Sequence, residues 1–313
     1  MPGRKKLTSL TRRRERRVAS PVHDTVHGRR PRLRERWAER GFSAADLLNL
    51  WTPAGGSRRH EQVRYGDAPR QQLDVYRPRR GDRAPMVVFF YGGSWQNGAR
   101  DLYAFLGASL AAQGIVTVVP DYAVYPEVRF PGFLEDAARA VAFARAHAAE
   151  WGGDPERLVL MGHSAGAHIA AMLACDPQWL AACGLDAHRD VAGLIGLAGP
   201  YDFLPIESPV LQTIFGGPDR AETQPISFVS GREAPALLIT AQRDALVEPG
   251  NSKRFAARIR EMGGRVEERG YGRVNHFTLI GAFAPGLRFL APVLRDVDAF
   301  VWQVTGRAAR AAG

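Results

Sequence analysis

Short apolar runs alternate with amphipathic stretches from about residue 60 to the end of the chain. The run Met86–Tyr91 is nearly all apolar, as a strand buried on both faces of a sheet should be. The stretch Pro131–Glu150 instead places apolar side chains such as Leu134 and Val141 on one helical face. Strands and helices that alternate along a chain form a mostly parallel sheet with helices on both faces. The sequence therefore predicts an α/β fold.

Each expected element is bounded by Gly, Pro or polar residues. We expect strands at Gln72–Tyr76, Met86–Tyr91, Ile115–Val119, Arg157–Met161, Val191–Leu197, Ala236–Thr240 and Arg265–Glu268, and helices at Leu102–Gln113, Pro131–Glu150, Ala165–Leu173, Ser252–Met262 and Pro285–Val304. The stretch Tyr201–Arg232 has no clean period and is rich in Phe, Leu, Ile, Pro and Gly. Segments of that length and kind tend to be lids or binding segments, so we expect a small lid insertion there.

The formal net charge of +10 is concentrated near the N-terminus. Residues 1–40 carry fourteen Lys and Arg against four Asp and Glu, which leaves residues 41–313 neutral overall. Such a run could bind RNA, DNA or an anionic membrane through counterion release, but no aromatic side chain precedes Trp37 to stack on bases. Because blocks of like charge are commonly disordered, we expect a disordered, solvated tail at 1–40 and one folded domain at 41–313.

The 2 cysteines, Cys175 and Cys183, are too few for a disulfide framework or a cysteine-based zinc site. Interpreted as reduced and buried, they indicate a reducing compartment. No apolar run reaches the ~18 residues that a membrane span needs. We therefore expect a cytoplasmic protein without a metal, and the sequence leaves homo-oligomerisation open.

Residues Gly162–Gly166 read Gly-His-Ser-Ala-Gly, a match to the pattern G-x-S-x-G. The apolar run Leu158–Met161 precedes it and an Ala-rich helix follows, which is the strand–turn–helix setting that the motif requires. So tight a turn leaves no room for side chains two positions either side of Ser164, and it lifts the hydroxyl above the sheet. Ser164 is therefore the predicted nucleophile, and the alternative is a small-residue turn at the start of a helix.

A serine nucleophile needs a base, and His276 has the most suitable place among the 8 histidines. It follows the last predicted strand, whereas His163 lies inside the turn and is expected to contribute packing there. Asp244 follows the strand Ala236–Thr240 and could hold the imidazole tautomer. The chain order Ser, Asp, His, with each residue after a separate strand, is typical of one arrangement of the catalytic triad.

The strand Met86–Tyr91 runs into Gly92-Gly93-Ser94-Trp95. A glycine-rich loop at this place can present backbone N–H groups to the negative oxygen of a tetrahedral intermediate. The alternative is an ordinary turn.

Over roughly residues 60–305 the chain resembles the α/β-hydrolase superfamily, in the esterase and lipase branch with a His-Gly-Gly-Gly-type motif. It is also similar to bacterial carboxylesterases of the feruloyl-esterase-like and kynurenine-formamidase-like group. The stretches that carry the resemblance are Tyr91–Trp95, Asp154–Arg157, Gly162–Gly166, Gly199–Phe203, Asp244–Glu248 and Asn275-His276.

The resemblance implies Ser164 as nucleophile, His276 as base and Asp244 as the residue that orients it. It also implies an oxyanion hole formed by the N–H groups of Gly93, Ser94 and Ala165. Two positions depart from the family pattern, because Tyr91 replaces the usual histidine and Ser94 replaces the third glycine. Ser94 keeps its N–H, and we expect its side chain to narrow the acyl side of the pocket.

These residues predict a serine carboxylesterase that hydrolyses small to medium esters through an acyl-enzyme, with no cofactor. An arylformamidase with the same triad is the alternative, and a non-catalytic binding module on this fold is a remoter one. One pocket wall is predicted from Trp95, Phe203, Leu204 and Phe215, although such residues could equally pack over the sheet. A second wall is expected from Trp37 and Leu47–Trp51.

Overall fold

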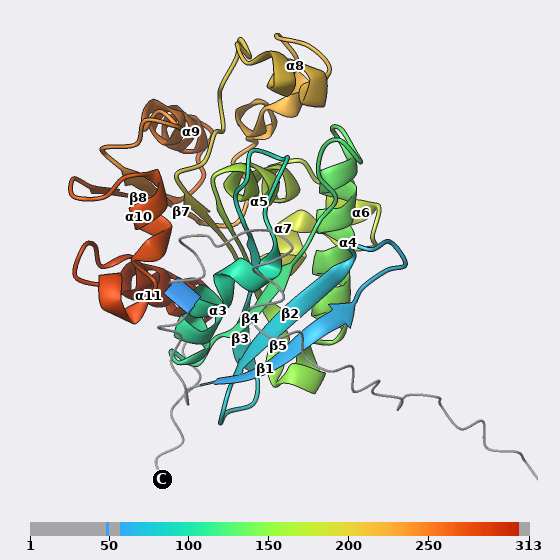
Figure 1. Cartoon of the computed structure of the whole chain (residues 1–313), viewed down its shortest axis with the longest axis vertical. Coiled ribbons are helices and arrows are strands. Elements are labelled where there is room, and N and C mark those ends of the chain that lie inside the picture. The colour runs from blue at the N-terminus through green and yellow to red at the C-terminus, as the bar shows by residue number, and fades with distance from the viewer. Residues whose placement is uncertain (1–47, 50–56, 307–313) are drawn as a thin grey trace, which may run out of the picture. The chain divides into compact units, whose positions relative to one another are not determined.

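The computed structural model describes residues 48–49 and 57–306, and within them an eight-stranded sheet has the order β1-β2-β4-β3-β5-β6-β7-β8 (Figure 1). The strands are β1 Ser57–Arg64, β2 Gln72–Pro78, β3 Ala84–Phe90, β4 Val116–Pro120, β5 Gly153–His163, β6 Gly193–Leu197, β7 Ala236–Ala241 and β8 Val266–Tyr271. Pairing is antiparallel from β1 to β2 and from β2 to β4, and it is parallel across the rest of the sheet.

Helices cover both faces of this sheet. The longer ones are α3 Ala104–Ala111, α4 Gly132–Ala146, α5 Ala165–Cys175, α9 Gly250–Glu261 and α11 Val293–Thr305. Helices α3 and α11 contact each other on one face, and α4 contacts α5 on the other (Figure 1). The predicted α/β fold, a mostly parallel sheet between helices, is confirmed.

The central strands are buried along their whole length, which explains their apolar composition. Every residue of β3, β4 and β6 is buried, since helices exclude water from both faces of a parallel sheet. On α4, Leu134, Ala137, Ala138 and Val141 are buried, as the periodicity predicts.

Two parts of the fold differ from the sequence-based expectation. Strand β1 was not expected, because Ser57–Arg64 is polar and lies at the edge of the sheet, where it pairs only with β2. The expected helix Pro285–Val304 is instead a short 3-10 turn, η5 Pro285–Leu287, followed by α11 from Val293. Pro292 stands directly before α11. Proline has no N–H to donate and disfavours helical geometry in the residue before it, so the helix starts after Pro292.

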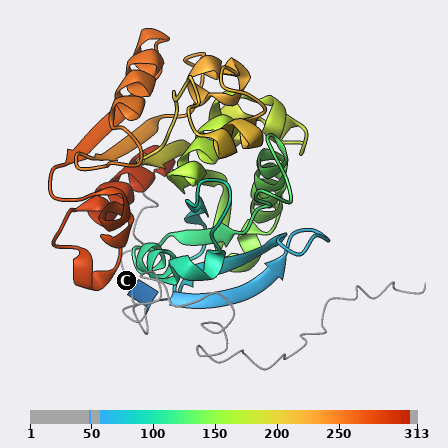
Figure 2. The same cartoon turned by 45° about the horizontal axis from the view of Figure 1, so that its top comes forward.

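The segment Tyr201–Arg232, expected to be a lid insertion, connects β6 to β7 and contains short helices: α8 Pro209–Phe215, η3 Ala221–Thr223 and η4 Pro225–Phe228. Figure 2 shows this gold segment beside the yellow-green helix α5, and α5 contacts η4. Nε2 of His168 on α5 donates to the carbonyl of Thr223, 2.8 Å away. The segment is therefore anchored to the helix that follows Ser164.

The remaining short helices are η1 Arg100–Tyr103, η2 Ala148–Trp151, α6 Gln178–Ala181, α7 Ala187–Asp190 and α10 His276–Gly281. In the part of the chain that is described, no helix is long and apolar enough to cross a membrane. The tail predicted at 1–40 and Trp37 lie outside the described residues, and of the segment Leu47–Trp51 only Leu48 and Asn49 are described.

Candidate active site

Ser164 occupies a sharp turn between β5 and α5. Its backbone has φ 55° and ψ −125°, a conformation that costs a non-glycine residue on the order of 1–3 kcal/mol and that clusters at functional sites. The Ser164 N–H donates to the carbonyl of Leu197 on β6, 2.9 Å away. Pairing with a neighbouring strand thus holds the strained residue in place.

The two glycines of the motif are required by close backbone approach. A Cβ on Gly162 would lie 2.1 Å from the carbonyl oxygen of Gly166, and a Cβ on Gly166 would lie 2.0 Å from that of Phe90. Both distances are far below van der Waals contact, and the clashing atoms are backbone. No side chain fits at either position.

Asp244 and His276 form a direct pair. Nδ1 of His276 lies 2.7 Å from Oδ2 of Asp244, and both side chains are nearly inaccessible to water. Burial acts to raise the pKa of Asp244. The hydrogen bonds from His276, Val247 and Leu246 outweigh that effect and hold the pKa below its ordinary value. The carboxylate is therefore ionised and accepts the Nδ1 proton, which leaves Nε2 of His276 free to act as a base.

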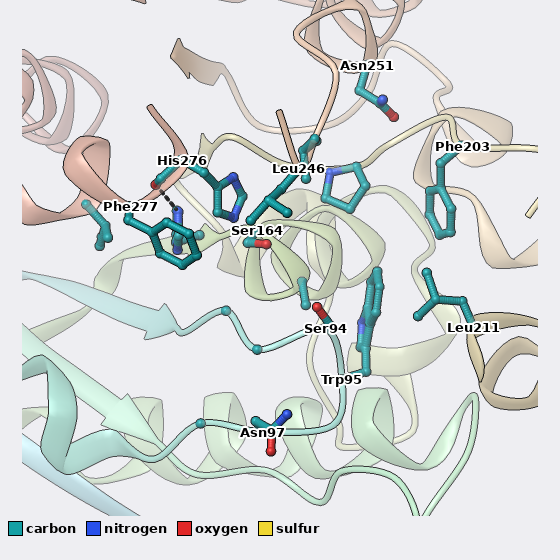
Figure 3. Close-up of a pocket in the computed structure, with 18 of the residues that line it drawn as sticks. Ser94, Trp95, Asn97, Ser164, Phe203, Leu211, Leu246, Asn251, His276 and Phe277 are labelled. Carbon is teal, nitrogen blue, oxygen red and sulfur yellow. Dashed lines mark hydrogen bonds between the residues drawn. The ribbon is translucent and has the colours of Figure 1, made fainter. Parts of the chain in front are cut away.

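His276 starts helix α10 instead of lying in a loop as expected from the sequence. Asn275 caps that helix: its side chain accepts from the N–H groups of Phe277 and Thr278, and the Thr278 hydroxyl bonds back to the Asn275 N–H. The capping box fixes the backbone of His276, the predicted base. Figure 3 shows the His276 ring and the Ser164 side chain together in one cavity, whose lining includes both residues.

His163 is a site residue whose role the sequence does not reveal. Its Nε2 lies 3.1 Å from the carbonyl oxygen of His276, to which it donates (dashed in Figure 3). The two imidazole rings are 4.7 Å apart. Burial, with the neighbouring His276, lowers the pKa of His163 to about 3, so the ring is neutral. In the sequence, the only sign of a role for His163 is its place beside Ser164 in the motif, and that place predicts packing alone.

The loop after β3 has unusual backbone geometry. Gly93, Ser94 and Trp95 all have positive φ, at 147°, 53° and 58°. Within the described part of the chain, the N–H groups of Gly93, Ser94 and Ala165 donate no hydrogen bond. Three free N–H groups in segments that line the same cavity as Ser164 are suited to an oxyanion hole.

A buried network supports this loop from beneath. The hydroxyl of Tyr91 donates to Asp121, 2.7 Å away, and accepts from Arg70, 2.9 Å away. Arg70 also donates to the carbonyls of Gly98 and Tyr122, and the Tyr122 hydroxyl donates to the Tyr91 carbonyl. Burial and Asp121 raise the pKa of Tyr91. Tyr91 thus stays protonated and connects the loop to the sheet, in the place where the family pattern has a histidine.

The cavity above Ser164 has a volume of about 780 Å³ and is lined mainly by apolar residues. Trp95, Phe203 and Leu204, predicted for the pocket wall, line it, and so does Leu48. Phe215 does not: its ring packs edge-on behind Trp95, with centroids 4.8 Å apart. Among the described residues no cluster of His, Cys, Asp and Glu is arranged to hold a metal ion.

Comparison with known proteins agrees with this architecture. The family described as BD-FAE matches residues 73–259. Esterase LipC of Mycobacterium tuberculosis is 33% identical over 258 residues, which cover 71% of this chain and 64% of LipC. Kynurenine formamidase of Danio rerio is 28% identical over 264 residues, covering 78% of this chain and 86% of that protein.

Among solved structures, EstE1, a thermophilic carboxylesterase cloned from a metagenomic library, superimposes with a TM-score of 0.70 at 20% identity. The match covers 84% of this chain and 94% of EstE1, and it supports the fold. The chain spans less than two thirds of the length of the first curated relatives, 64% of LipC and 48% of a probable methylesterase of Arabidopsis thaliana. The family match covers more than half of the sequence, and the chain therefore belongs to the BD-FAE family, in the esterase branch of the α/β-hydrolase superfamily.

Proposed function

We propose that the protein is a serine carboxylesterase that hydrolyses small to medium esters through an acyl-enzyme. The observation that carries this proposal is the 2.7 Å pair of His276 and Asp244, whose histidine lines the same cavity as Ser164 on its strained turn. A nucleophile, a base and a group that orients the base are the parts that acyl transfer needs.

The mechanism follows from this geometry. Ser164 Oγ attacks the ester carbonyl while His276 Nε2 takes the hydroxyl proton, and Asp244 stabilises the imidazolium that forms. The N–H groups of Gly93, Ser94 and Ala165 stabilise the oxyanion. Loss of one such donor typically costs on the order of 10²–10³ in rate. His276 then gives the proton to the leaving alcohol, and water repeats the sequence on the acyl-enzyme.

The cavity is of the size expected for a small molecule, since ligand pockets usually measure roughly 300–1,000 Å³.

Arylformamidase activity is the second candidate. It is favoured by the similarity to kynurenine formamidase, of which 86% is matched, and a formamide would use the same three residues. A cytoplasmic location stays a prediction, supported by the free thiols of Cys175 and Cys183.

The test is hydrolysis of p-nitrophenyl esters from acetate to octanoate, beside formanilide as an N-formyl arylamine. We expect short-chain esterase activity that is lost in Ser164→Ala and falls about 10⁴-fold in Asp244→Asn, because the asparagine favours the wrong imidazole tautomer. Equal activity in Ser164→Ala would contradict the proposal. A folded enzyme that cleaves formanilide and no ester is a formamidase. Wild-type rates in Asp244→Asn would transfer the orienting role to Glu248 or Asp202.

A further inference from the structure

The alcohol part and the acyl part of an ester substrate lie on opposite sides of Ser164. This division of the cavity rests on the proposed esterase mechanism. His276 must donate its proton to the oxygen of the leaving alcohol, so the alcohol part lies on the His276 side. The acyl part extends the other way. Figure 3 shows Phe277 and Leu246 beside His276, and Trp95, Phe203 and Leu211 beyond Ser164.

Phe277 and Ile280, on the helix that starts at His276, line the cavity on the His276 side. Apolar lining residues on two further segments are Leu48, Leu102, Tyr103 and Phe105. Helix α10 approaches Leu48, whose side chain would lie 3.7 Å from a Cβ on Gly281. The side chain of Asn49, the residue after Leu48, donates to the carbonyl of Asp101 at 2.8 Å and accepts from the N–H of Phe105 at 3.1 Å. It thereby joins Leu48 to the η1–α3 region. These contacts make one continuous wall.

None of the described residues named for this wall carries a charge. The charged residues that line the cavity are Asp202, Glu207, Glu248 and Arg254. Asp202 and Glu207 lie in the insertion, and Arg254 on α9 pairs with Asp202 and Glu248 at 2.5 and 3.4 Å. A charged alcohol on the His276 side would therefore lose water without gaining a partner.

Phe277 of this wall and the nearby Leu246 are large and apolar, yet both remain open to solvent. Phe277 is 67% exposed and Leu246 is 64% exposed, and both line the cavity directly beside the catalytic pair. Exposed apolar groups that gather at a cavity indicate a place where an apolar ligand binds and covers them. Phe277 immediately follows the base, so a leaving group that receives the proton of His276 lies within its reach.

We propose that this enzyme is selective for esters of bulky, uncharged, apolar alcohols, with the alcohol part bound against the wall that contains Leu48, Phe277 and Ile280. Aryl-methyl and branched alkyl alcohols belong to this class. Methanol and anionic alcohols do not, because the former leaves the wall exposed and the latter finds no cation among the described residues of the wall.

The test uses two isomers with the same atoms, benzyl acetate and methyl phenylacetate, which carry the ring on the alcohol and on the acyl part. The measured quantity is the ratio of kcat/KM for benzyl acetate to kcat/KM for methyl phenylacetate. We expect Phe277→Ala to lower this ratio about tenfold, as loss of a few apolar contacts in a pocket does, and Phe203→Ala to raise it by a similar factor. Phe289→Ala is the matched control, because Phe289 is 77% exposed and does not line the cavity. That variant should leave the ratio unchanged.

A second comparison tests the charge. The carboxylate of 4-(acetoxymethyl)benzoate lies on the alcohol part, and we expect its kcat/KM to be at least tenfold below that of benzyl acetate. An unchanged ratio in Phe277→Ala, or equal rates for the charged and uncharged acetates, would overturn the proposal. Failure of the esterase function itself is recognised separately, because the wild type would then hydrolyse neither isomer, or hydrolysis of both would persist in Ser164→Ala.

Discussion

At the scale of single residues, the His163 imidazole connects three parts of the site. It belongs to the turn that carries Ser164, it donates to the His276 carbonyl at 3.1 Å, and its Nδ1 would lie 3.1 Å from a Cβ on Gly92 in the loop after β3. In the proposed mechanism His276 becomes positively charged, so a neutral ring is needed at His163, whose ring centre is 4.7 Å away. We therefore propose that His163 positions His276.

Two substitutions separate that role from packing. His163→Gln places an amide N–H close to the position of Nε2, whereas His163→Met fills similar space without a donor. We expect kcat to fall about tenfold in the methionine variant, the cost of a lost buried hydrogen bond, with little change in KM. The glutamine variant should stay within about threefold of wild type and keep its pH–rate profile. Equal losses in both variants would mean that the ring only fills space.

At the scale of elements, the loop after β3 is held at both ends by one side chain. Arg70 bonds the Tyr91 hydroxyl and the Gly98 carbonyl, each at 2.9 Å. The strained positive φ angles of Gly93, Ser94 and Trp95 persist only if the surrounding structure enforces them. Arg70 therefore preorganises the proposed oxyanion hole although it lies outside the cavity lining.

We expect Arg70→Met to lower kcat about tenfold without raising KM, because a loosened loop weakens stabilisation of the transition state more than binding of the substrate. This is less than the effect of losing an oxyanion donor outright. Arg64→Met is the control, since the exposed Arg64 side chain bonds the nearby Asp67 carbonyl, at 2.7 Å, and no other described residue. Steady-state kinetics with p-nitrophenyl butyrate measures kcat and KM of both variants, whose melting temperatures are first shown to match. A rise in KM with unchanged kcat would contradict a role in preorganisation.

The elements that the sequence predicts are those with strong local signals. The buried strand β3 is a continuous apolar run and the helix α4 carries a helical period in the sequence. The chain order of Ser164, Asp244 and His276 follows the strands. Strand β1 carries no such signal, because pairing with β2 alone stabilises its polar residues. The same holds for contacts between distant segments. The Tyr91 hydroxyl meets Asp121 thirty residues along the chain, and the Nε2 of His163 meets a carbonyl 113 residues away. No local pattern encodes such pairs.

At the scale of the whole molecule, two buried histidines connect the turn of Ser164 and helix α5 to the rest of the fold. His163 is 4% exposed and His168 is fully buried. His168 is surrounded by aromatic rings, including Trp95 and Phe215 at 5.1 and 5.6 Å, and it donates to the insertion at Thr223. Burial lowers the pKa of His163 to about 3 and that of His168 to about 4, from an ordinary value of 6.5. Both rings are therefore neutral in the folded protein.

This pair makes the fold sensitive to acid in a defined window. Below pH 6.5 the unfolded chain binds a proton at each histidine while the folded protein does not, so the free energy of unfolding falls as the pH falls. The loss is about 1.4 kcal/mol per pH unit for each group, and it continues until the folded pKa of about 4 for His168 and about 3 for His163. Asp244 also lowers the free energy of unfolding in acid, but only below its ordinary pKa of 3.8. Its pKa is lowered in the folded protein, so its stabilising contribution is present above that value and is lost as the pH falls further.

Urea unfolding at pH 7.5, 6.0 and 5.0 measures this sensitivity outside the window of Asp244. We expect the free energy of unfolding to decrease between pH 6.0 and 5.0 in the wild type, and to decrease by roughly 1 kcal/mol less in His168→Gln. The glutamine keeps a donor for the Thr223 carbonyl but binds no proton, so only the pH dependence should change and not the anchoring of the insertion. His163→Gln should reduce the slope by a similar amount, and the effects of the two substitutions should add. A slope that is the same in wild type and His168→Gln would show that His168 is not held neutral by the fold.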